Sequence, residues 1–70
     1  MKYAVVIEQG PTSFGAYVPD LPGCVAVGES REEVVRLIQE AMELHLRSLQ
    51  EQGQNSPLPA SSIEIVNVAA

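Results

Sequence analysis

Four acidic side chains in the first half of the chain could bind a metal ion or transfer protons. Asp20 follows a proline, and three glutamates, Glu29, Glu32 and Glu33, surround a serine further along. Neighbouring carboxylates can hold Mg²⁺ or share the roles of general acid and general base. Each of these acids also has a structural explanation. Asp20 suits a turn, Glu33 suits helix capping, and the other two suit the positive end of a helix dipole. We therefore expect no metal site, and a Mg²⁺-dependent hydrolase stays as a third alternative.

One cysteine, Cys24, and one histidine, His45, could form a nucleophile and its base. Nothing in their spacing places them together. Cys24 follows a tight turn and opens a strand, where a small buried apolar group is expected. His45 lies on or beside an apolar helix face, which favours packing or a partner contact. A single cysteine also excludes an intrachain disulfide and a thiolate metal cluster within one chain. We expect no catalytic residue and no cofactor.

Three short runs of β-branched and aromatic residues predict strands over residues 3–8, 14–18 and 25–27. Gly10 and Pro11 separate the first two runs. Pro22 and Gly23 suit a type II turn before the third. Short links between neighbouring strands favour an antiparallel meander.

A long amphipathic helix is predicted to follow. Ser30 and Glu33 form a capping box, in which the serine oxygen accepts from the Glu33 amide and the Glu33 side chain reaches back to the Ser30 amide. Apolar residues then recur at helical spacing from about Arg31 to near Gly53. After a proline-containing loop, residues 63–68 predict a fourth strand. The expected fold is α+β in the order β-β-β-α-β, with the helix packed on one face of the sheet.

The size and composition of the chain limit its possible functions. Its 70 residues, of which 46% are apolar, predict a single domain over residues 1–70. No apolar run approaches the ~20 residues of a membrane span, and no signal peptide is recognisable, so we expect a cytoplasmic protein. The formal net charge of −5 opposes direct nucleic-acid binding and suits a basic protein partner.

The segment from Tyr17 to Glu33 resembles the N-terminal domain of HicB-type antitoxins. It contains a tyrosine-bearing strand, the run Pro-Asp-Leu-Pro-Gly-Cys over residues 19–24, a second strand, a glycine, Glu29-Ser30 where Asp-Thr is more usual, and a helix that opens with Glu-Glu. The resemblance extends from about Tyr3 to Pro59. It implies a partial ribonuclease-H-like fold without the nuclease's catalytic acids. It also implies a HicA-like partner, a small basic toxin that cleaves mRNA, whose RNA-binding face and active histidine the antitoxin would cover.

Complete members of this family usually carry a C-terminal DNA-binding segment, and we expect this chain to lack it. Operon autoregulation is then not predicted for the chain alone, and a stand-alone oligomeric adaptor with another protein partner stays as the alternative function. Strands that are apolar on both faces predict a homo-oligomer, most simply a dimer. The residues expected to contact a partner surround the turn and the helix start: Tyr17, Pro19, Asp20, Leu21, Glu29 and Glu32.

Overall fold

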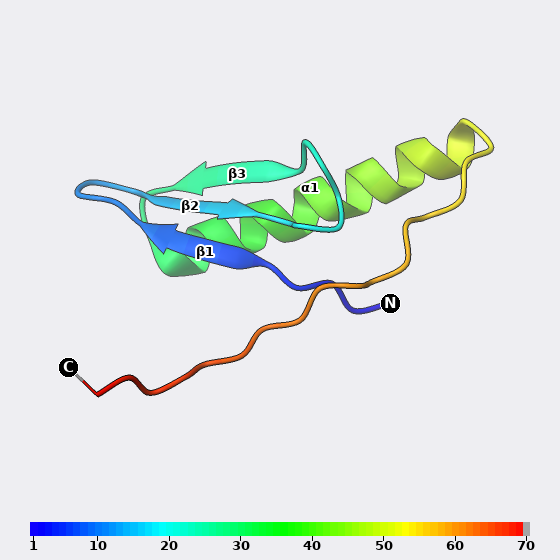
Figure 1. Cartoon of the computed structure of the whole chain (residues 1–70). Helices are drawn as coiled ribbons and strands as arrows, with labels where there is room; N and C mark the ends of the chain where they lie inside the picture. The colour runs from blue at the N-terminus through cyan, green and yellow to red at the C-terminus, as the bar shows by residue number, and fades with distance from the viewer. Residues whose placement is uncertain (70) are drawn as a thin grey trace.

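A three-stranded antiparallel sheet with one long helix across one of its faces forms the folded part of the chain (Figure 1). The computed structural model describes residues 1–69. The strands are β1 (Val6–Gln9), β2 (Phe14–Tyr17) and β3 (Val25–Gly28), in the order β1-β2-β3, and the helix is α1 (Arg31–Glu51). The predicted α+β class and antiparallel meander are confirmed. No helix among residues 1–69 is long and apolar enough to cross a membrane.

The register of the sheet sorts its side chains into two faces. Ile7 pairs with Ala16, which pairs with Ala26, and these residues face α1. The neighbouring row, Val6, Tyr17 and Val25, points to the other face because side chains alternate along a strand. Helix α1 therefore covers one face, and the other stays open in the described structure.

The core lies between the sheet, the β2–β3 turn and α1. Its buried residues are Ala16, Val18, Leu21, Cys24, Val34 and Ile38. Leu21 of the turn and Val34 of the helix are the two largest side chains that are fully buried. The turn is therefore part of the core rather than an appendage to it.

Helix α1 begins where the sequence predicts, with one difference in its cap. The Ser30 hydroxyl accepts from the Glu33 amide at 3.1 Å, as the capping box requires. The Glu33 carboxylate, however, accepts from the Glu29 amide at 2.7 Å, one residue before the predicted Ser30 amide. The side chain thus ties the helix start to the end of β3. Gly28 permits this close approach, because a Cβ there would lie 3.0 Å from both Glu33 Oε1 and Val34 N.

Helix α1 ends as predicted near Gly53. Gly53 has a φ of 73°, its amide donates to Gln50 O, and the next amide, from Gln54, donates to Leu49 O. This pair of hydrogen bonds satisfies the last carbonyl groups of the helix. The chain can then reverse direction and return along the sheet.

The predicted fourth strand over residues 63–68 is not formed within the described residues. This segment carries no strand assignment, and no backbone hydrogen bond joins it to the sheet. Its side chains are exposed. A strand needs a partner edge, and the segment leaves the sheet instead of pairing with it (Figure 1). The fold that is shown is therefore three strands and one helix, without the predicted fourth strand.

Candidate protein-interaction site

The β2–β3 turn is a hydrogen-bonded loop at one end of the sheet. The amide of Leu21 donates to Val18 O at 3.0 Å, and the amide of Cys24 donates to Leu21 O at 3.1 Å. Gly23 has a φ of 85°, the left-handed conformation that a type II turn requires at this position. With Leu21 buried beneath it, the turn holds the exposed Pro19 in a fixed position.

Asp20 of this turn binds the C-terminal part of the chain. Its Oδ2 accepts from the amides of Ala60 and Ser61, both at 2.9 Å, and its Oδ1 accepts from Ser61 Oγ at 3.0 Å. The hydrogen bonds from the Ser61 and Ala60 amides hold the pKa of the Asp20 carboxyl below its usual value. Part of the carboxylate's accepting capacity is therefore already used inside the chain.

The face of the sheet that α1 does not cover is largely apolar. It presents Val6, Tyr17, Val25 and Val27, which we call the open face, and the register places the exposed Glu8 of β1 on the same side. Tyr17 is 41% exposed, Val25 64% and Val27 69%. A contiguous apolar surface with an aromatic residue on a rigid sheet is typical of a protein-binding surface. Its residues other than Tyr17 were not among those predicted, although the alternation of Val25 and Val27 around Ala26 carried the signal.

The acidic helix start lies at the opposite end of β3 from the turn. Glu29 and Glu32 are both exposed there, on either side of the Ser30 cap. Four strand residues at about 3.3 Å each separate this group from Tyr17, so the two groups are on the order of 10 Å apart. The open face lies between them. The structure thus divides the exposed members of the predicted contact set into two groups near the ends of the open face, while Leu21 is buried beneath the turn.

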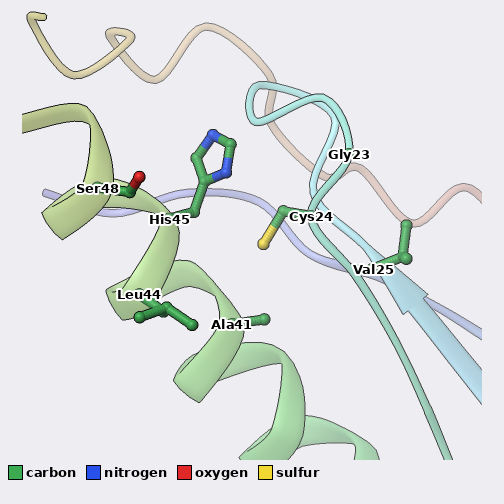
Figure 2. Close-up of a pocket in the computed structure, with 7 residues that line it drawn as sticks. All are labelled: Gly23, Cys24, Val25, Ala41, Leu44, His45 and Ser48. Carbon is green, nitrogen blue, oxygen red and sulfur yellow. The ribbon is translucent and has the colours of Figure 1, made fainter. Parts of the chain in front are cut away.

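Cys24 and His45, which spacing alone did not bring together, line the same cleft. Figure 2 shows the cleft between the β2–β3 turn and α1, with Cys24 and Val25 on one side and Ala41, Leu44, His45 and Ser48 on the other. Its volume is about 280 Å³. Cys24 is buried, as predicted, and burial raises the pKa of its thiol. A raised pKa keeps the thiol protonated at neutral pH, which is unfavourable for a nucleophile.

Residues 1–69 contain no cluster of three or more histidine, cysteine or acidic side chains that could hold a metal ion. Within the same residues the Glu33 carboxylate is engaged by the Glu29 amide, and that of Asp20 by the chain near Ser61. The predicted acidic group is therefore spread over two ends of the sheet.

Together these features describe a small α+β module that offers a largely apolar sheet face with acidic residues near its ends, a surface suited to another protein. Residues 3–69 match the family model described as the HicB-like antitoxin of bacterial toxin-antitoxin systems. The chain belongs to this family, and the resemblance found in the sequence is confirmed.

Two curated proteins and one solved structure are similar to this chain. A UPF0150 protein of Helicobacter pylori (strain J99) is 49% identical over 50 residues, which cover 71% of this chain and 69% of that protein. A UPF0150 protein of Thermoplasma acidophilum is 32% identical over 71 residues and matches over the full length of both chains. Among solved structures, a chain from a HicA3 and HicB3 toxin-antitoxin complex superposes with a TM-score of 0.70 at 27% identity, covering 86% of this chain and 70% of that one.

Proposed function

We propose that this protein is an antitoxin domain that binds a HicA-like toxin and blocks it by covering its surface, without chemistry of its own. The observation that carries the proposal is the match of residues 3–69 to the antitoxin family, together with the likeness to a chain of a HicA3 and HicB3 complex. A tightly bound protein that covers an active site inhibits it by steric exclusion alone. The setting we propose is the cytoplasm.

The open face and its acidic ends are the contact surface in this proposal. Tyr17 supplies an aromatic anchor on a strand, and Pro19 adds a rigid group at the turn. Glu29, Glu32 and the net charge of −5 attract a basic partner and speed its approach. Asp20 and Leu21 support the contact surface instead of forming it, because Leu21 is fully buried and Asp20 binds the chain at Ser61. Both residues stabilise the position of the turn.

Co-expression with the product of an adjacent toxin-like reading frame tests the proposal. The wild-type chain should rescue growth and purify as a complex with the toxin. Val25→Asp, which puts a charge on the open face, should weaken the complex at least tenfold. Val35→Asp makes the same substitution at a helix residue that is 42% exposed, and it should bind as the wild type does. Failure of the wild type both to rescue growth and to form a complex would contradict the antitoxin role.

We also propose that the chain assembles as a dimer. The alternative function, a stand-alone oligomeric adaptor, is favoured by one observation, the apolar segment over residues 63–68 that stays exposed in the single chain. Capture of a different specific partner by the open face, with no binding to the adjacent toxin, would select this alternative.

A further inference from the structure

We propose that residues 62–68, which we call the tail strand, add to the free edge of β1 in a second copy of this chain, so that two copies exchange their tails. The inference deepens the dimer in the proposed function and rests on it. It does not depend on toxin binding.

The tail strand has the composition of a strand but pairs with no strand among residues 1–69. Ile63 is 57% exposed, Ile65 84%, Val66 70% and Val68 80%. Short segments that are rich in β-branched residues and low in charge pair readily with any open sheet edge. Such a segment left uncovered would promote aggregation. Pairing with a defined edge removes this hazard.

A receiving edge is present on the same molecule. Within the described part of the chain, the strand order leaves the outer edge of β1 without a neighbour. Between Val6 and Gln9 the only charge is Glu8, and the strand contains no lysine or proline, the residues that usually protect an edge. The edge and the tail strand therefore each expose unpaired backbone groups.

The path of the chain directs the tail strand outward. The Tyr3 hydroxyl donates to Pro57 O, and Asp20 binds the amides of Ala60 and Ser61. These contacts fix the chain up to Ser61. The tail strand therefore starts from a defined position beside the turn.

Beyond Ser61 the tail strand passes β1 without pairing to it. Ile63 and Ile65 line a cleft of about 330 Å³ with Val5, Val6, Ile7 and Arg31. Residues from both faces of the sheet line this cleft, so it lies at the edge of β1. No backbone hydrogen bond joins the tail strand to its own β1 in the described residues. In Figure 1 the orange and red end of the chain runs away from β1.

A tail that leaves its own sheet can bury its side chains on a second copy, which offers the same edge. The exchange is reciprocal, so a dimer with a twofold axis pairs both tail strands and covers the β1 edge of each copy. Seven extended residues span on the order of 20 Å, enough to cover the whole of β1. A single closed dimer therefore pairs both the tail strand and the outer edge of β1 in each copy.

Sedimentation equilibrium of the full chain tests the proposal first. The wild type should be a dimer at tens of micromolar, and Ile65→Asp/Val66→Asp should be a monomer with an unchanged helical circular dichroism signal. The matched control, Gln50→Asp/Gln54→Asp, adds the same two charges at exposed positions outside the tail strand and should stay dimeric. A monomeric wild type would overturn both the exchange and the proposed dimer. A tail variant that stays dimeric would overturn the exchange alone.

Crosslinking separates exchange from pairing within one chain. In a Cys24→Ala background, one protein carries Glu8→Cys in β1 and a larger, tagged protein carries Val66→Cys in the tail strand. After mixing and re-equilibration, a short thiol crosslinker should join the two into a species of mixed mass. If the mixture gives no such species while a chain with both cysteines crosslinks to itself when dilute, the exchange is refuted. Toxin rescue, measured with the same tail variants, reports on the antitoxin role independently.

Discussion

Asp20 holds Ser61 with both oxygens of its carboxylate, across 41 residues of sequence: Oδ2 accepts from the Ser61 amide at 2.9 Å and Oδ1 from the Ser61 hydroxyl at 3.0 Å. The contact joins the β2–β3 turn to the segment that follows the helix. It therefore connects the turn beside the open face to the start of the tail strand. A single carboxylate affects both surfaces that we propose for binding.

The attachment of the tail should depend on pH through Asp20. Its pKa is lowered in the folded chain, chiefly by the hydrogen bonds from the Ser61 and Ala60 amides. A lowered folded pKa means that the contact stabilises the chain above the unfolded value of about 3.9 and is lost as pH falls through the lower folded value. The amide chemical shifts of Ala60 and Ser61 should titrate together, with a midpoint below the usual range of an aspartate.

Two variants define this titration. Asp20→Asn should abolish the acid transition at Ala60 and Ser61. Glu64→Gln removes an exposed carboxylate of the tail strand and should leave the transition in place. If the acid transition at Ala60 and Ser61 persists in Asp20→Asn, a group other than Asp20 causes it.

Gly28→Ala should destabilise the domain by about 1–3 kcal/mol, because the added methyl group overpacks the start of the helix. The Cβ would lie 3.0 Å from Val34 N and 3.2 Å from Val34 Cα, and backbone atoms cannot move aside cheaply. Chemical denaturation measures the change. Gly15→Ala is the matched control in the neighbouring strand, where no atom lies within 4 Å of the added Cβ. Equal midpoints for both variants would show that the contact at Gly28 relaxes freely.

Leu21→Ala should cost roughly 2–5 kcal/mol, as expected for a fully buried leucine. The free energy of unfolding of a chain this small is low, so the variant should be largely unfolded at 37 °C. Leu58→Ala is the control, since Leu58 is 80% exposed and the change should stay within about 0.5 kcal/mol. Thermal unfolding followed by circular dichroism compares the two. Similar melting temperatures would mean that the turn is not part of the core.

Much of the fold could be predicted from local signals. The Pro22–Gly23 turn, the Ser30 cap and the end of the helix at Gly53 each depend on residues close in sequence, and the structure confirms all three. The strands begin or end up to three residues from their predicted limits, because strand ends depend on where a neighbour can pair. Local patterns predict that a helix or strand is present more reliably than they predict its first and last residues.

The site was harder to predict, because it depends on contacts between distant parts of the chain. The sequence pattern of residues 63–68 indicates a strand but cannot show which edge pairs with it. Asp20 lies in the turn, as interpreted, but the contacts of its carboxylate with Ala60 and Ser61 were not predicted. Likewise, Cys24 and His45 line opposite sides of one cleft only because the turn folds back onto the helix. Each of these relationships joins residues that are far apart in the sequence, so no short stretch of sequence indicates it.

The Cys24 thiol should react slowly with a thiol reagent such as Ellman's reagent in the native protein. Burial raises its pKa and restricts access, so little reactive thiolate is present at neutral pH. Cys24→Ala/Ser48→Cys moves the thiol to the exposed helix side of the same cleft, and this variant should react at least tenfold faster. Denaturant should remove the difference, because unfolding exposes both thiols equally. If native Cys24 reacts as fast as the cysteine at position 48, the turn opens readily, and the side of the cleft that carries Cys24 is accessible to reagents. Slow reaction in the native state would support the interpretation of Cys24 as a core residue that fixes the turn beside the open face.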